Sequence, residues 1–125
     1  MDYRHGTGHG VGSLLCVHEG PIGISRGNKT VLEEGMCISN EPGFYKDGEF
    51  GIRIENIMMV QKHPSIDGSL YFENLTKAPY CRELIETNLM STEFIDHVNY
   101  YSEVCQILLQ PHIEDDKLAL DYVER

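Results

Sequence analysis

The sequence predicts an α+β fold in which an antiparallel sheet is followed by helices. In the first two-thirds, short apolar runs are separated by Gly, Pro and Asn turn signals, which is typical of strands. In the last third, apolar residues recur at helical spacing. Because the strands come first and the helices last, we expect segregated strands and helices rather than alternating βαβ units. At 125 residues, the whole chain, 1–125, fits one domain that can bury a core.

The first part of the sheet is expected from two segments. The apolar run at 14–17 predicts a short strand. Residues 20–28 contain three Gly, one Pro and one Asn, so we expect them to form a loop.

The next segments predict a hairpin. A strand is expected over residues 36–40, and Pro42 prevents it from continuing. A turn signal at 46–48 then precedes a long strand that is expected over 50–60. The segment 36–60 is therefore expected to be an antiparallel hairpin with an elaborate tip. A further strand is expected over 69–77.

Two helices are expected at the end. Ser91 and Thr92 are available as N-caps, and Gln110-Pro111 ends the helical pattern. A second, short helix is expected from about residue 115 to the C-terminus. The apolar stripe of the first helix consists of Phe94, Val98, Tyr101, Cys105 and Leu108.

Composition excludes several classes of partner. The net charge of −10 argues against nucleic acid and against an anionic membrane, because both require clustered Lys and Arg. The sequence contains neither a secretory h-region nor an apolar run long enough to span a bilayer, so we expect a cytoplasmic protein. The cysteines form no Cys-x-x-Cys pair and are expected to be buried free thiols: Cys16, Cys37, Cys81 and Cys105.

Four glycines, at 6, 8, 10 and 12, follow His5 closely, and two of them flank His9. A dinucleotide fingerprint beginning at Gly6 or Gly8 would require glycine where Val11 or Ser13 stands, and no Gly-Lys-Ser/Thr follows. These glycines therefore favour a close approach of the backbone to a ligand, or a tight turn that presents the histidines.

Charged residues on the predicted strand over 50–60 also indicate a site. With strict alternation, Arg53 and Glu55 would share a face with Ile57 and Met59. Charges among aliphatic side chains require each other, another partner or a metal.

His9, Glu41 and Glu55 are candidate metal ligands. One imidazole and two carboxylates suit divalent ions such as manganese, cobalt or zinc. Two such ions can activate water and polarise a carbonyl group. The alternative is that His9 is an ordinary polar residue of a Gly-rich loop.

Four strings of the sequence combine the candidate ligands with glycine and proline: HGTGHGVG (5–12), VHEGP (17–21), NEPGFY (40–45) and FGIRIEN (50–56). Together they resemble the C-terminal half of the catalytic domain of Xaa-Pro aminopeptidase (aminopeptidase P). They occur in the family's order, at compatible spacing, and the segments 72–76 and the closing helices resemble the tail of its eukaryotic cytosolic form. The resemblance implies the pita-bread fold, which is shared with prolidase, creatinase and methionine aminopeptidase.

The resemblance implies a dinuclear metal site and a substrate. His9 matches the histidine ligand, Glu41 a carboxylate ligand that is also the general base, and Glu55 the carboxylate that bridges both metals. The two divalent ions are expected to be manganese, with zinc or cobalt as alternatives. The substrate is a peptide with proline at its second position, and the bond before that proline is cleaved.

The resemblance also implies roles for residues that bind no metal. His5 and His18 match histidines that line the substrate site and stabilise the reaction intermediate, and are therefore catalytic together with Glu41. Arg53 matches an arginine that orients the carboxylates. Asn40 departs from the aspartate that is frequent in the family at this position, which is not a ligand position.

Two aspartate ligands of the family precede the histidine motif, and no aspartate of this chain matches them. We therefore expect a C-terminal fragment of the catalytic domain that holds three of five ligands, binds metal weakly or not at all, and is inactive alone. Uncovered apolar surface and sheet edge predict self-association, for example as a dimer.

Alternatives remain open. Creatinase, which uses no metal, is disfavoured because all three ligand types are present. Prolidase shares these ligands and is harder to exclude, although the tail after Val60 favours aminopeptidase P. A non-catalytic module that binds peptides or proteins would also lack the aspartates, and a generic α+β domain is the least specific alternative. Three further histidines fit none of the strings and receive no function: His63, His97 and His112.

Overall fold

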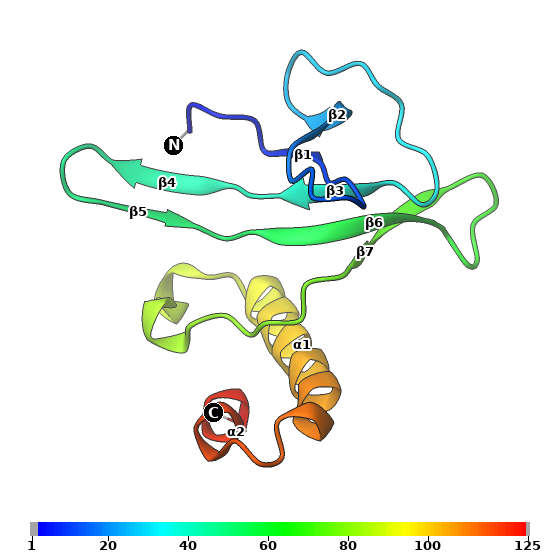
Figure 1. Cartoon of the computed structure of the whole chain (residues 1–125). Coiled ribbons are helices and arrows are strands. Elements are labelled where there is room, and N and C mark those ends of the chain that lie inside the picture. Colours follow the sequence, from blue (N-terminus) through cyan, green and yellow to red (C-terminus); the bar gives the residue numbers. More distant parts are fainter. Residues whose placement is uncertain (1–2, 125) are drawn as a thin grey trace. The chain divides into compact units, whose positions relative to one another are not determined.

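A computed structural model describes residues 3–124. The chain divides into two compact units, Met1–Thr76 and Lys77–Arg125. All strands lie in the first unit and all helices in the second, within the described residues (Figure 1). The predicted α+β class is therefore confirmed.

The first unit contains a five-stranded sheet and a two-stranded ribbon. The sheet has the order β2-β1-β3-β6-β7, and neighbouring strands are antiparallel. In the ribbon, β4 (Gly43–Lys46) pairs with β5 (Phe50–Arg53). The strands of the sheet are β1 (Gly8–Gly10), β2 (Glu19–Ile24), β3 (Cys37–Asn40), β6 (Asn56–Lys62) and β7 (Leu70–Asn74).

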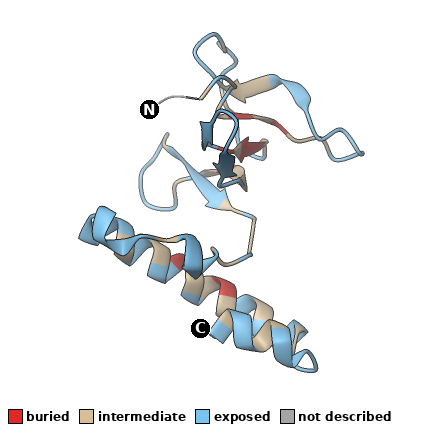
Figure 2. Ribbon diagram, turned by 90° about the vertical axis from the view of Figure 1, so that its left-hand side faces the viewer, coloured by how far each residue is buried: buried red, intermediate tan, exposed pale blue. Residues whose placement is uncertain are grey.

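The buried centre of this unit lies on the middle strands (Figure 2). Ile38 on β3 and Val60 on β6 are 0% and 1% exposed. Two polar side chains are buried with them, Ser39 and Glu41. A buried carboxylate requires compensating partners, so Glu41 marks a place where this sheet supports more than packing.

The hairpin predicted over 36–60 is confirmed, because Cys37 pairs with Met59 and Gly43 with Arg53. The long strand predicted over 50–60 is wrong, since it is interrupted between β5 and β6. Pro42, which lies opposite the interruption, has no N–H to donate to the ladder, and its carbonyl accepts the Ile54 N–H at 3.2 Å. The alternation of side chains between the two faces is therefore broken between Arg53 and Ile57. The expectation that Arg53 shares a sheet face with Ile57 loses its basis.

The two predictions for the first part of the sheet are wrong. Residues 14–17 form an exposed loop, in which Leu14 and Leu15 are 83% and 97% exposed. The Gly12 N–H donates to the Cys16 carbonyl at 2.8 Å and closes this loop on itself. The predicted loop over 20–28 instead contains most of β2, which pairs with β1.

The second unit is built around α1 (Thr92–Leu109). As predicted, Ser91 caps this helix, because its hydroxyl accepts the Phe94 N–H at 3.3 Å. Among the described residues, no helix is long and apolar enough to cross a membrane. The remaining helical segments are η1 (Arg82–Leu84), η2 (Thr87–Leu89), η3 (Gln110–His112) and α2 (Lys117–Glu124).

Two residues of α1, Tyr101 and Cys105, are buried. The Tyr101 hydroxyl donates to the Ala78 carbonyl at 2.9 Å, and its ring stacks on Tyr80 at 4.7 Å. The prediction that the cysteines are buried holds for Cys105. It is wrong for Cys16 and Cys81, which are exposed.

Candidate metal centre

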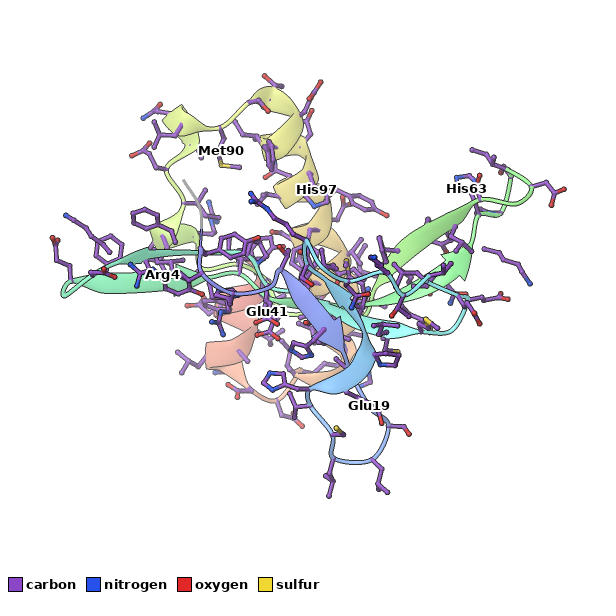
Figure 3. The ribbon with its side chains drawn as sticks, turned by 90° about the horizontal axis from the view of Figure 1, so that it is seen from above. Arg4, Glu19, Glu41, His63, Met90 and His97 are labelled. Carbon is purple, nitrogen blue, oxygen red and sulfur yellow. The ribbon has the colours of Figure 1, made fainter. Side chains whose placement is uncertain are left out.

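Three predicted ligands from separate parts of the first unit come together. His9 lies on β1, Glu41 directly follows β3, and Glu55 directly precedes β6. Each offers one ligand atom, and these atoms lie within 4.8 Å of one another. Figure 3 shows Glu41 beside β1, far from His63 in the β6–β7 turn. The arrangement has the donor types and the convergence that a divalent ion requires.

Glycines on both sides of His9 allow β1 to fit between its neighbours. A Cβ atom added to Gly8 would lie 1.9 Å from the Ser39 carbonyl oxygen, and one added to Gly10 would lie 2.1 Å from that of Glu19. Any other residue would force the strands apart. The Gly-x-Gly spacing is therefore a packing requirement that holds His9 against β3.

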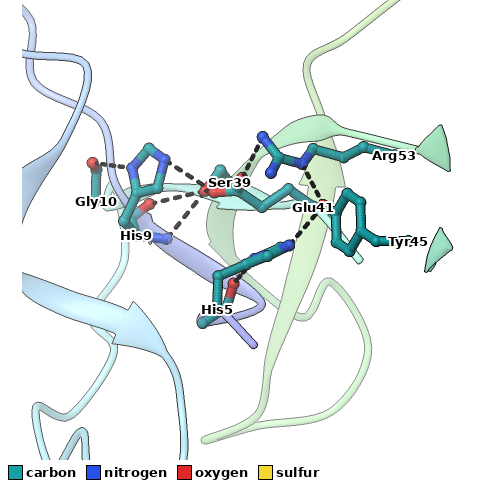
Figure 4. A network of polar contacts seen from close by, with 8 residues as sticks. His5, His9, Gly10, Ser39, Glu41, Tyr45 and Arg53 are labelled. Carbon is teal, nitrogen blue, oxygen red and sulfur yellow. Dashed lines mark hydrogen bonds and ion pairs between the residues drawn. The ribbon is translucent and has the colours of Figure 1, made fainter. Parts of the chain in front are cut away.

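The His9 ring has a defined orientation (Figure 4). Its Nδ1 lies 2.9 Å from the Gly10 carbonyl oxygen, which can only accept, so Nδ1 carries the proton. Its Nε2 then lies toward Glu41, 2.9 Å from Oε1. A backbone carbonyl that fixes the ring in this way is the usual support of a metal-binding histidine.

The Glu41 carboxylate is held by one buried and one exposed neighbour, Ser39 and Arg53. The Ser39 hydroxyl donates to Oε1 at 3.0 Å and accepts the backbone N–H of His9 at 2.9 Å. Arg53 Nη1 lies 3.6 Å from Oε2. Ser39, which sequence reasoning missed, thus links the histidine strand to the carboxylate. A serine within a strand carries no signal of this role in the sequence alone.

A directed chain of hydrogen bonds joins Arg53 to His5 through Tyr45 (Figure 4). The Arg53 Nε–H donates to the Tyr45 hydroxyl oxygen at 3.0 Å. The His5 Nδ1 lies 2.7 Å from the Gly6 carbonyl and must donate to it. In the neutral ring, Nε2 then accepts the Tyr45 O–H at 2.7 Å. Because Arg53 also reaches Glu41, this chain connects His5 with the carboxylate.

Arg53 is a cation at neutral pH, and its contacts stabilise that charge. The hydrogen bond to Tyr45 raises the pKa of Arg53, and the carboxylates of Glu41 and Glu55 add to the effect. A permanent positive charge beside two carboxylates orients them and offsets their mutual repulsion.

Sequence reasoning also missed Tyr45. A Cβ atom on Gly43 would lie 2.4 Å from the Tyr45 hydroxyl, and one on Gly51 would lie 2.8 Å from its ring. Two glycines around one tyrosine are a pattern in the sequence that could have indicated a ring lying flat across the ribbon.

His18 lies beside the ligand histidine. Its ring centroid is 4.2 Å from that of His9, with the ring planes at 89°. The remaining three histidines lie elsewhere: His63 follows β6, His97 lies in α1 and His112 ends η3. Of the predicted site residues, His5, His9, His18, Glu41, Arg53 and Glu55 thus belong to one connected region of the first unit.

Curated relatives match over most or all of the chain. It is 47% identical to "Probable Xaa-Pro aminopeptidase P" of Fusarium vanettenii over 100% of this chain, and 46% identical to "Aminopeptidase P1" of Lotus japonicus over 92%. It spans 22% and 18% of the length of these relatives.

A solved structure has the same fold. It is the crystal structure of X-prolyl aminopeptidase from Caenorhabditis elegans, described as a cytosolic enzyme with a di-nuclear active site. The TM-score is 0.85 at 33% identity, over 98% of this chain and 21% of that one. The expected fold, the C-terminal half of a pita-bread domain, is thereby confirmed.

Two family profiles match consecutive parts of the chain. Metallopeptidase family M24 matches residues 1–62, and the C-terminal region of peptidase M24 matches residues 68–125. Together with the relatives and the shared fold, these matches show that the chain belongs to metallopeptidase family M24.

Proposed function

We propose that this chain forms part of the active site of a dinuclear-metal aminopeptidase that cleaves the peptide bond between an N-terminal residue and proline. The observation that carries the proposal is the convergence of His9, Glu41 and Glu55 within 4.8 Å. The names of the relatives support the substrate class, a peptide with proline at the second position.

His9 and the two glutamates would hold the metal ions. One imidazole with two carboxylates suits manganese, which we favour, and zinc or cobalt as alternatives. When bound, such ions lower the pKa of a water molecule and polarise the scissile carbonyl group. We propose that further ligands complete the site and that these 125 residues alone bind metal weakly and turn over no peptide.

The residues of this chain supply the proton transfer and the orientation. Glu41 is the proposed general base, and its hydrogen bond from Ser39 together with the nearby Arg53 fixes where its oxygens point. His5 and His18 are proposed to contact the scissile carbonyl and the proline side of the substrate. The Tyr45 hydroxyl fixes the His5 ring, so that Nε2 is presented in one orientation.

We further propose a cytoplasmic location and association of copies of the chain. The location rests on the description of the worm enzyme as cytosolic. The association rests on apolar side chains that lie exposed on the β4–β5 ribbon, including Phe44 and Phe50.

Paramagnetic manganese tests the metal site even when binding is weak. In the ¹⁵N-labelled chain, we expect manganese to broaden the amide signals of His9, Glu41 and Glu55 first. Glu41→Gln should abolish this selectivity, whereas Glu73→Gln, an exposed glutamate on β7, should preserve it. Broadening that begins instead at the acidic run 114–116, or that is unchanged in Glu41→Gln, would contradict the proposed ligand set.

Peptide binding tests the substrate class. The tripeptide Ala-Pro-Ala should shift the ring signals of His5 and His18 at lower concentration than Ala-Ala-Ala does. Equal effects of the two peptides would argue against proline selection by this part of the site. Hydrolysis by the isolated chain at the rate of an intact enzyme would overturn the proposed need for further ligands.

A further inference from the structure

A second feature adjoins the candidate metal centre. A pocket of about 320 Å³ is lined by residues 3–7 together with Ser25 and Arg26. One of its lining residues is His5, whose ring is hydrogen-bonded to Tyr45. A ligand in this pocket would therefore touch the same histidine that the proposed reaction uses.

The pocket is basic in an acidic chain. Arg4, His5 and Arg26 line it, although the chain carries a net charge of −10. The substrate of an aminopeptidase carries an ammonium group at its N-terminus, which two guanidinium groups repel. The pocket is thus suited to the other end of the peptide, beyond the proline.

An internal contact shows that Arg4 can engage a carboxylate here. Arg4 Nη2 lies 3.4 Å from Asp47 Oδ2, and the two side chains are 94% and 85% exposed. An ion pair between such exposed groups is weak, so the carboxylate of a ligand can replace Asp47. Guanidinium groups also bind carboxylates in a planar, paired geometry that favours them over neutral amides.

We propose that the pocket lined by Arg4 and Arg26 binds a carboxylate of the peptide substrate on the C-terminal side of the scissile bond. This carboxylate comes either from the C-terminus of a short peptide or from an acidic side chain. The proposal rests on the proposed function, and it makes the two arginines determinants of specificity rather than participants in bond cleavage.

The test measures peptide binding to the ¹⁵N-labelled chain without added metal. Ala-Pro-Ala as the free acid should bind roughly fivefold more tightly than its C-terminal amide, a ratio that exposed charge pairs can provide. The peptide Ala-Pro-Glu amide distinguishes the sources: tight binding of this peptide assigns the pocket to side-chain carboxylates, and weak binding assigns it to the C-terminus. Equal affinity for all three peptides would overturn the proposal.

Substitutions of the two arginines test whether the preference for the free acid arises in this pocket. The double variant Arg4→Gln, Arg26→Gln should bind acid and amide equally, whereas Arg4→Lys, Arg26→Lys should retain part of the preference. Lys29→Gln, an exposed cation of the same loop that does not line the pocket, is the matched control. Preference that persists in the double glutamine variant would contradict the assignment. Because no metal is added, the peptide-binding result does not depend on metal binding. The manganese result, in turn, does not depend on the two arginines, so the two proposals can fail separately.

Discussion

Tyr45 connects the two sides of the candidate metal centre. Its hydroxyl accepts from Arg53, which lies 3.6 Å from the Glu41 carboxylate, and donates to His5, which is proposed to face the substrate. One hydroxyl thereby fixes the direction of two hydrogen bonds. The other ring nitrogen of His5, Nδ1, is hydrogen-bonded to the Gly6 carbonyl. The tautomer of His5 therefore depends on contacts at both ring nitrogens.

Tyr45→Phe should release the His5 tautomer. Without the hydroxyl, Nε2 loses its donor, and the ring can exchange between tautomers or rotate away from the Gly6 carbonyl. At a pH where imidazole is neutral, we expect the ¹⁵N shifts of Nδ1 and Nε2 of His5 to move toward each other. Tyr71→Phe is the control, because Tyr71 contacts the His63 ring through its own ring. Unchanged His5 shifts in Tyr45→Phe would contradict the hydrogen-bond chain.

The residues of the site differ in how far the sequence reveals them. His9, Glu41 and Glu55 stand within strings whose residue types and spacing indicate metal ligands. Ser39 and Tyr45 act through contacts that exist only once β1 pairs with β3 and β4 with β5. Strand pairing places them beside the ligands. The glycines around Tyr45 could indicate where its ring lies, but they do not indicate which residues its hydroxyl contacts, and Ser39 has no such signal.

At the scale of elements, β1 shows how a strand of three residues can position a ligand. It lies between β2 and β3, and its glycines leave no room for a side chain on either side of His9. The close approach also brings the Ser39 hydroxyl to the His9 N–H. The geometry of the candidate site thus depends on the spacing of these strands.

Gly8→Ala should destabilise the first unit. The added Cβ would lie 1.9 Å from the Ser39 carbonyl oxygen, so β1 and β3 must separate. We expect the free energy of unfolding, measured in urea, to fall by more than about 2 kcal/mol, because overpacking against a fixed backbone is destabilising. Gly27→Ala, where an added Cβ meets nothing within 4 Å, should change it by less than about 0.5 kcal/mol. Equal stability of the two variants would contradict this packing.

The fold could be predicted where hydrophobic period and turn signals agree. The helix over 92–109 and the 36–60 hairpin satisfy both conditions. The predictions failed at 14–17, where an apolar run lies in an exposed loop closed by its own hydrogen bond, and at β2, where Gly and Pro lie within a strand. In β2, pairing with β1 outweighs residue preference.

Within α1, Tyr101 makes the second unit sensitive to alkali. Burial and the neighbouring Cys105 raise the pKa of Tyr101 above its ordinary value of 10.0. Below that value, the phenol is neutral in both the folded and the unfolded chain. Above it, the phenol ionises in the unfolded chain alone, so the free energy of unfolding should fall as the pH rises from about 10 toward the folded-state pKa.

This alkaline loss can be measured through the helical circular dichroism signal during urea unfolding between about pH 9 and pH 11. Tyr101→Phe should lose less stability over this range than the unchanged chain. Tyr100→Phe, at a position in the same helix that is 67% exposed, should behave like the unchanged chain. An identical pH dependence of all three proteins would show that burial of this phenol does not determine the alkaline loss.

At the scale of the whole molecule, the proposed association of copies rests on an apolar face of the β4–β5 ribbon. Phe44 pairs across the ribbon with Ile52, and Lys46 with Phe50, so these four side chains share one face, opposite that of Tyr45. Phe44, Phe50 and Ile52 are 42%, 52% and 42% exposed, and the phenylalanine rings lie 5.9 Å apart. Contiguous apolar surface of this kind is typical of an interface.

Light scattering at increasing protein concentration should therefore show the average mass rising above that of a monomer. Phe50→Ser combined with Ile52→Thr should shift this rise to higher concentration, because the apolar area that a second copy can cover is reduced. Leu14→Ser is the matched control, since Leu14 is 83% exposed in a loop outside this face. A strict monomer at the highest concentration would contradict self-association, and an equal shift in Leu14→Ser would place the interface elsewhere. Because the ligands of the candidate metal centre lie outside the changed positions, manganese should broaden the same amides in the double variant, which separates assembly from metal binding.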